Sequence, residues 1–129
     1  MILLDTHVLL WLLLGDRRLK APVRRRIATA REVGVSAITF WEVPTLVRLG
    51  RLRAVEPVGG WRGAVLSLGI TDIPIDSEIA WNAGAMHHAH GDPADRLIMA
   101  TSLARSAKLV TADREILEHR GDLSLIDAS

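Results

Sequence analysis

Four acidic residues occupy positions from which their side chains can meet in one site. Asp5 and Asp113 each directly follow a short apolar run that predicts a strand. Glu42 falls in a helical segment after another such run, and Asp95 lies in the first turn of a long amphipathic segment. Because loops that follow parallel strands meet at one edge of a sheet, we expect these four carboxylates to converge.

Four converging carboxylates would repel each other and titrate abnormally unless a cation neutralised them. A site of oxygen ligands without cysteine suits Mg²⁺ or Mn²⁺. One or two such ions can activate a water and hold a phosphate in line, which is the chemistry of phosphodiester hydrolysis. Taken singly, Asp5 and Asp95 are also good helix-terminus residues, so the joint placement of the four acids carries the prediction.

Strands and helices are predicted to alternate along the chain. Apolar runs bounded by caps and breakers predict strands at residues 1–4, 33–38, 70–75, 108–110 and 123–126. Helices are predicted at residues 8–14, 22–32, 39–49, 61–68, 77–88, 94–107 and 113–119, with a Pro/Gly-rich loop over residues 55–63. This alternation indicates an α/β fold with a mainly parallel central sheet and helices on both faces.

Length and composition are those of one globular domain spanning residues 1–129. The net charge of +1 does not indicate nucleic-acid binding, but Lys and Arg concentrate at residues 17–31 and 48–53. Such clusters are either solvated helix faces or phosphate-binding surfaces. The absence of cysteine excludes disulfides and thiolate chemistry.

The apolar opening at residues 1–14 lacks a basic leader, contains Asp5 and His7, and is too short to span a bilayer. We therefore expect no membrane segment and a cytoplasmic protein.

Four segments, in this order and spacing, resemble PIN-domain toxins of the VapC type. The segments are Asp-Thr-His-Val-Leu-Leu-Trp (5–11), Ser-Ala-Ile-Thr-Phe-Trp-Glu (36–42), Asp-Pro-Ala-Asp-Arg-Leu-Ile (92–98) and Leu-Val-Thr-Ala-Asp (109–113). Each segment alone is weak evidence, but together they cover nearly the whole chain. The resemblance implies a PIN-like three-layer fold and an endoribonuclease that acts as the toxin of a type II toxin–antitoxin pair.

The resemblance also implies site residues, a cofactor and partners. By position, Asp5 and Asp95 would bind Mg²⁺ or Mn²⁺ directly, and Glu42 and Asp113 would complete the acidic site through waters or a second ion. Thr111 would support the metal waters or the substrate phosphate. The implied partners are an RNA substrate, a VapB-like antitoxin and a second copy of the chain.

Two positions bear on this assignment. Pro44 lies two residues after Glu42 and is expected to kink or delay that helix, which affects where Glu42 points. Asp92 competes with Asp95, but Asp92 precedes Pro93 as a natural helix cap. For Arg96, a surface ion pair is expected ahead of contact with RNA.

Other conspicuous side chains are assigned ordinary roles. The histidines at 87, 88 and 90 do not have the spacing of a zinc site. The four tryptophans, which could stack on bases, are expected in the core or in a dimer interface: Trp11, Trp41, Trp61 and Trp81.

Two other classes of protein share parts of the pattern. A receiver-like domain also has an acidic pocket, with Asp76 as its middle acid, but Lys108 precedes its strand where a receiver needs a Lys after one. A non-catalytic PIN-like binding module is the second alternative, and the presence of all four acids argues against it.

Overall fold

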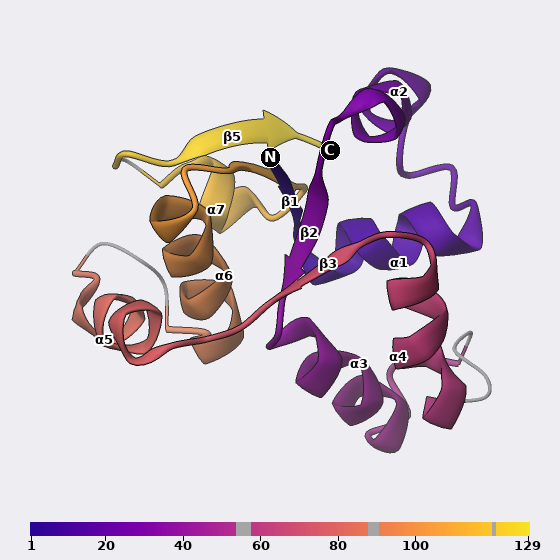
Figure 1. Ribbon diagram of the computed structural model, residues 1–129, viewed down its shortest axis with the longest axis horizontal. Helices are drawn as coiled ribbons and strands as arrows, with labels where there is room; N and C mark the ends of the chain where they lie inside the picture. Colours follow the sequence, from indigo (N-terminus) through magenta and orange to yellow (C-terminus); the bar gives the residue numbers. More distant parts are fainter. Residues whose placement is uncertain (54–57, 88–90, 120) are drawn as a thin grey trace.

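The computed structural model describes residues 1–53, 58–87, 91–119 and 121–129. Within these ranges the chain forms five strands: β1 (Ile2–Leu4), β2 (Val33–Ser36), β3 (Thr71–Ile73), β4 (Lys108–Thr111) and β5 (Ser124–Asp127). It also forms helices α1 (Thr6–Leu14), α2 (Ala21–Thr29), α3 (Thr39–Arg48), α4 (Val58–Ser67), α5 (Ser77–Ala85), α6 (Pro93–Ala104) and α7 (Arg114–Leu117). As predicted, helices separate successive strands, two in each of the first three connections and one in the last (Figure 1).

The strands form one sheet in the order β3-β2-β1-β4-β5, and every pairing in it is parallel. β1 is central, with Ile2 paired to Val33 of β2 on one side and to Lys108 of β4 on the other. The order of strands reverses beside β1, and ligands bind beyond the carboxyl ends of strands at such a point. The topology therefore places the ends of β1 and β4 together at the predicted site.

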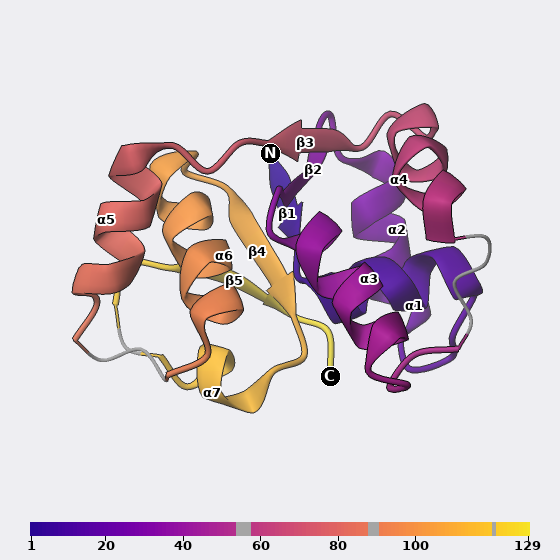
Figure 2. The same cartoon turned by 90° about the horizontal axis from the view of Figure 1, so that it is seen from below.

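Helices cover both faces of the sheet, which confirms the predicted three-layer α/β fold. Ile2 and Leu4 pack on the face covered by α1, α2 and α4, while Leu3 packs on the opposite face against α6 and α7. α5 lies outside α6 and packs against it (Figure 2). Alternate residues of β1 are buried in different clusters because successive strand side chains point to opposite faces.

Two glycines are needed for different local reasons, one for close packing and one for a left-handed backbone conformation. A Cβ at Gly34 of β2 would lie 2.9 Å from Ile73 Cδ1 and 3.2 Å from the Thr71 carbonyl oxygen, so glycine permits the close approach of β3. Gly15 ends α1 with φ of 64°, as its position after the apolar helix predicted.

Several predicted boundaries were wrong, and α2 and α6 end at Thr29 and Ala104, three residues before their expected ends. The loop expected over residues 55–63 is helical from Val58 onward, and residues 54–57 lie outside the described ranges. Helix α5 ends at Ala85, ahead of the expected residue 88. Helix α3 begins at Thr39 as predicted, so Pro44 does not delay it, and the helix continues through Pro44, its sixth residue, where the missing N–H removes one internal hydrogen bond. Packing of Val43 against Leu10 of α1 helps to hold α3 in place.

Across the described part of the chain, no helix has both the length and the apolar character needed to cross a membrane.

Candidate active site

Asp5 lies at the carboxyl end of β1 and is only 3% exposed. Its Oδ1 accepts a hydrogen bond from the Thr6 N–H at 2.7 Å, which caps the start of α1. Its Oδ2 accepts from the Thr111 hydroxyl at 2.7 Å, and its N–H donates to the Val110 carbonyl at 3.0 Å. Both carboxylate oxygens are therefore held in position by groups on α1 and β4.

The Glu42 side chain points toward Thr6, the residue after Asp5, even though Pro44 lies in the same helix as Glu42. The Thr6 hydroxyl donates to Glu42 Oε1 at 2.6 Å and lies 3.0 Å from the hydroxyl of Thr39. Thr6 has a single hydroxyl proton and it is used on Glu42, so Thr39 donates to Thr6. Both threonines are buried, and together they link α1 to the first turn of α3.

Asp113 follows β4 and caps α7. Its Oδ1 accepts from the N–H groups of Glu115 at 2.8 Å and Ile116 at 3.3 Å, while its own N–H donates to the Thr111 hydroxyl at 3.0 Å. Thr111 is fully buried, and its hydroxyl connects the backbone of Asp113 to the side chain of Asp5. Thr111 thus orients the carboxylate of Asp5 and fixes the backbone at Asp113.

The competition between the two aspartates at the start of α6 is resolved by their hydrogen bonds. Asp92 is the cap, because its Oδ1 accepts from the Ala94 N–H at 2.9 Å and from the Asp95 N–H at 3.4 Å. Asp95 is in the first helical turn, and the charges that act on it include those of Asp5, Asp113 and Glu42. The structure therefore places all four predicted acids at the same end of the sheet, close enough for their charges to interact, and Asp92 adds its charge to theirs.

The acids perturb one another's protonation. Burial, then repulsion from Asp5, Asp92, Asp113 and Glu42, raises the pKa of Asp95 to about 8. Burial also raises the pKa of Glu42, with further contributions from Asp5 and Asp92, although the bond from Thr6 opposes the shift. Such acids gain from a bound cation at neutral pH.

The pKa of Asp5 is raised as well, and burial is the main cause. The hydrogen bond from Thr111, the electrostatic influence of His7 and the bond from the Thr6 N–H lower this pKa, while Asp113 raises it. A buried carboxylate that is hydrogen bonded on both oxygens is held in place but remains costly to ionise.

The donor set fits a hard divalent cation by charge and ligand type. Among the described residues, no group of three His, Asp or Glu side chains forms a ready-made set of metal ligands. Mg²⁺ retains several waters and is commonly held by one or two carboxylates, so Asp5 and Asp95 with water ligands would meet its needs. A bound cation would also relieve the repulsion that raises the pKa of Asp95.

Arg96 connects two helices, a role that its position beside Asp95 in the sequence did not predict. Its guanidinium donates to the carbonyl oxygens of Ala83 at 2.9 Å, Gly84 at 3.1 Å and Met86 at 2.6 Å. These carbonyls lie at the carboxyl end of α5, where a cation complements the helix dipole. Arg96 therefore fastens α5 to the first turn of α6, next to the acid that this turn presents.

The tryptophans are not uniformly in the core. Trp11 and Trp61 are half-buried, but Trp41 is 59% and Trp81 is 78% exposed, so these two do not pack in the core, and a dimer interface stays the prediction for them. Of the histidine cluster, His87 is exposed, and positions 88 and 90 lie outside the described residues.

Sequence reasoning missed Thr6, Thr39 and His7 as members of the site. Thr6 and Thr39 support Glu42, and His7 acts electrostatically on Asp5 and Glu42. The available signal was their proximity in sequence to Asp5 and Glu42, but hydroxyl residues at helix starts are more often caps.

The receiver-like alternative does not match this geometry. Receivers have the strand order 2-1-3-4-5, whereas this sheet has the order 3-2-1-4-5. Asp76 caps α5 through a 2.9 Å bond from the Ile79 N–H, and Lys108 lies at the amino end of β4, away from the acids.

A parallel 3-2-1-4-5 sheet with an acidic cluster at the carboxyl ends of β1 and β4 defines the class of PIN-like nuclease folds. The PIN domain family model matches residues 2–122, so this chain belongs to the PIN domain family. It is 35% identical over 120 residues to "Ribonuclease VapC22" of Mycobacterium tuberculosis, covering 92% of each chain.

Solved structures share the fold at lower identity. A toxin–antitoxin complex from Klebsiella pneumoniae contains a chain with a TM-score of 0.70 and 20% identity, covering 100% of this chain and 98% of that one. A chain in VapBC2 from Rickettsia felis, bound to a promoter DNA fragment, gives a TM-score of 0.71 and 15% identity, covering 98% of both chains.

Proposed function

We propose that this protein is a divalent-metal-dependent endoribonuclease that hydrolyses RNA phosphodiester bonds and serves as the toxin of a type II toxin–antitoxin pair. The observation that carries the proposal is the convergence of four acids, Asp5, Glu42, Asp95 and Asp113. Burial and the charges of the other acids raise the pKa of Asp95 to about 8. Membership of the PIN domain family and identity to a protein named as a ribonuclease support it.

Mg²⁺ or Mn²⁺ would lower the pKa of a water and neutralise charge on the scissile phosphate. Asp5 and Asp95 would hold the ion, while Glu42 and Asp113 would position waters or bind a second ion. Thr111 keeps Asp5 in orientation through its 2.7 Å hydrogen bond, and Thr6 does the same for Glu42. Because these side chains are fixed before substrate binds, the site loses little free energy to reorganisation.

We further propose a VapB-like antitoxin and a second copy of the chain as partners. Exposed Trp41 and Trp81 provide apolar surface of the kind that protein interfaces cover. Because β5 lies beyond the matched residues 2–122 yet pairs with β4, we propose that residues 1–129 form one domain. We also propose that the protein acts in the cytoplasm, where cellular RNA is found.

The decisive experiment is cleavage of a mixed RNA pool by the full-length protein in Mg²⁺, Mn²⁺ or EDTA. Asp5→Asn is the test variant, and Asp76→Asn is the matched control because an asparagine at that position can still cap α5. We expect cleavage that needs the metal, is lost in Asp5→Asn and persists in Asp76→Asn. Cleavage that is equal in EDTA, or unaffected by Asp5→Asn, would contradict the proposal, and folded protein that binds RNA without cleaving it would indicate a binding module.

A further inference from the structure

The basic segment at residues 17–31 divides into two sets of side chains with different surroundings. Arg18 pairs with Asp16 at 2.7 Å and lies over the Trp11 ring, with its guanidinium carbon 5.0 Å from the ring centroid. Arg24 donates to the carbonyl oxygens of Asp16 at 2.7 Å and Leu19 at 3.1 Å. These two arginines stabilise the connection between α1 and α2.

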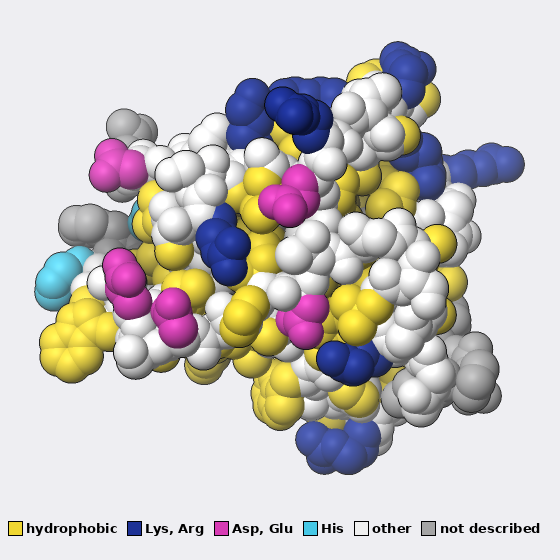
Figure 3. All heavy atoms as spheres, viewed as in Figure 1, with side chains coloured by type: hydrophobic (Ala, Val, Ile, Leu, Met, Phe, Trp, Pro, Cys, Tyr) yellow, Lys and Arg dark blue, Asp and Glu magenta, His cyan; other side chains and the backbone are white. Residues whose placement is uncertain are grey.

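Arg26 and Arg31 belong to the other set and line a surface pocket of about 310 Å³ together with Lys108. The sheet register brings Arg31 and Lys108 to the same end of the sheet. Ile2 of β1 pairs with Lys108 on one side and with Val33, two residues after Arg31, on the other. Lys and Arg side chains gather along the edge of the molecule where the N-terminus and α2 lie (Figure 3). The pocket is therefore at the amino end of β1, opposite the acidic site.

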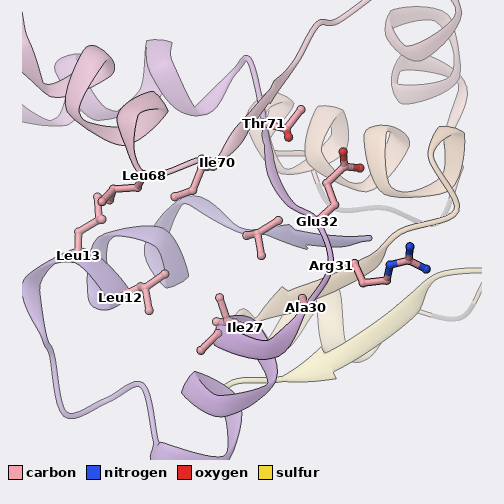
Figure 4. A pocket seen from close by; sticks show the side chains of 12 residues that line it. Leu12, Leu13, Ile27, Ala30, Arg31, Glu32, Leu68, Ile70 and Thr71 are labelled. Carbon is pink, nitrogen blue, oxygen red and sulfur yellow. The ribbon is translucent and has the colours of Figure 1, made fainter.

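The pocket is positively charged and has no acid of its own. Met1, Ile2, Thr29 and Ala30 complete its lining, and none of them is acidic. The neighbouring Glu32 points away from Arg31 and borders a larger pocket of about 710 Å³ between the ends of α1, α2 and α4 (Figure 4).

The three cations of this pocket also lack internal partners. Within the described ranges, the side chains of Arg26, Arg31 and Lys108 form no hydrogen bond or ion pair. Three like charges around one hollow repel each other, and an anion in the hollow would relieve that repulsion.

We propose that Arg26, Arg31 and Lys108 form a phosphate-binding site separate from the acidic site. Two guanidinium groups can each offer paired N–H donors to phosphate oxygens, and the lysine adds a point charge. Such contacts recognise phosphate without reading a base. The phosphate comes either from the backbone of a long RNA or from free phosphate, and the RNA source rests on the proposed ribonuclease function.

The path between the two sites suits an RNA that extends well beyond the cleaved bond. β1 joins the sites through the buried centre of the sheet, and helices cover both of its faces, so an RNA can reach both sites only by passing around those helices. That path is several times the roughly 10 Å that the three residues of β1 span, so we expect an RNA of many nucleotides to bind both sites and a very short RNA to occupy only one.

The RNA test uses Asp5→Asn protein, so that RNA is bound without being cut, and compares a 30-nucleotide RNA with a 6-nucleotide RNA. The test variant adds Arg26→Ala, Arg31→Ala and Lys108→Ala. The matched control adds Arg17→Ala, Arg25→Ala and Arg105→Ala, three exposed cations that do not line the pocket. Dissociation constants are measured as a function of salt concentration.

For the long RNA, we expect the test variant to reduce the slope of log affinity against log salt by about 2, since each phosphate contact contributes about 0.7 for a single strand. The control should reduce the slope by less than half as much, and the short RNA should show no difference between the variants. This pattern would identify the RNA backbone as the source of the phosphate.

The second arm titrates inorganic phosphate into otherwise unaltered protein and follows the thermal midpoint. Stabilisation that is lost in the triple variant, without any effect on RNA, would identify free phosphate as the source. No difference from the control in either arm would overturn the site. Failure of the ribonuclease proposal is separate, because it appears as absent cleavage by the unsubstituted protein whatever the basic pocket binds.

Discussion

The two ends of the sheet carry opposite charge. At the carboxyl ends of β1, β2 and β4 the segments that follow them and the first turn of α6 bring four acids together, while at the amino ends of these strands three cations surround a pocket. A net charge of +1 conceals this separation. The comparison shows that in a parallel sheet the position of a charge relative to its strand matters more than the total charge.

The two ends also differ in how their side chains are held. Asp5 is buried, with hydrogen bonds from Thr6 and Thr111, whereas Arg31 and Lys108 are exposed. Ordering and burying charge costs free energy, and exposed charges avoid that cost. Substitutions at the carboxyl end should therefore change activity and, where they break a buried hydrogen bond, stability as well, whereas those at the amino end should change binding alone.

The largest effect is expected from Asp5→Asn. Cleavage in Mg²⁺ should fall by at least about 100-fold, because a metal ligand is lost. The thermal midpoint of the metal-free protein should stay the same or rise, since a buried charge is removed while the shape is kept. A large fall in the midpoint would mean that Asp5 is chiefly a structural cap.

Thr111→Val should have the next largest effect. It removes the bond to Asp5 and leaves the Asp113 N–H without its partner, so the free energy of unfolding should fall by about 1–3 kcal/mol. Cleavage should fall by about 10–100-fold because Asp5 loses its orientation. Thr111→Ser is the matched variant and should retain most of both properties in urea unfolding and cleavage assays; equal losses in Ser and Val would show that the methyl group matters more.

The pH dependence of stability gives a smaller effect at the same end. The carboxyl of Asp95 has its pKa raised to about 8 in the folded protein from an ordinary value of 3.8, so the folded state binds more protons than the unfolded state between these values. The metal-free protein should therefore lose stability as pH rises from about 4 to about 8. Asp95→Asn should flatten this part of the thermal-midpoint profile, and an unchanged profile would contradict the assignment.

The smallest effect on stability is expected from Arg31→Ala at the amino end. The side chain is exposed and has no partner in the described structure, so the free energy of unfolding should change by less than about 0.5 kcal/mol. Cleavage of a 6-nucleotide RNA should not change, because that RNA does not reach the basic pocket. A loss of stability near that of Thr111→Val would remove the contrast between the two ends.

Local signals were enough to predict most of the framework. Short apolar runs identified all five strands, Asp5 and Asp92 were recognised as helix starts, and Gly15 was recognised as a helix end. The convergence of the four acids followed from placing each one relative to a strand or helix terminus. These signals work because hydrogen-bonded caps and side-chain periodicity involve residues close in sequence.

Contacts between distant segments could not be predicted in the same way. Thr6 is 33 residues from Thr39 and 36 from Glu42, and no local pattern distinguishes a hydroxyl that supports a carboxylate from one that caps a helix. The role of Arg96 at the end of α5 likewise depends on how two helices pack.

The sequence by itself determined the alternating α/β framework and the edge of the sheet at which the acids meet. Only the tertiary structure decided that Glu42 points to Thr6 in spite of Pro44, that Trp41 and Trp81 are exposed, and that Arg31 lies beside Lys108. The physical reason is range: strands and caps form from neighbouring residues, whereas burial and side-chain partners depend on which surfaces the packed helices bring together.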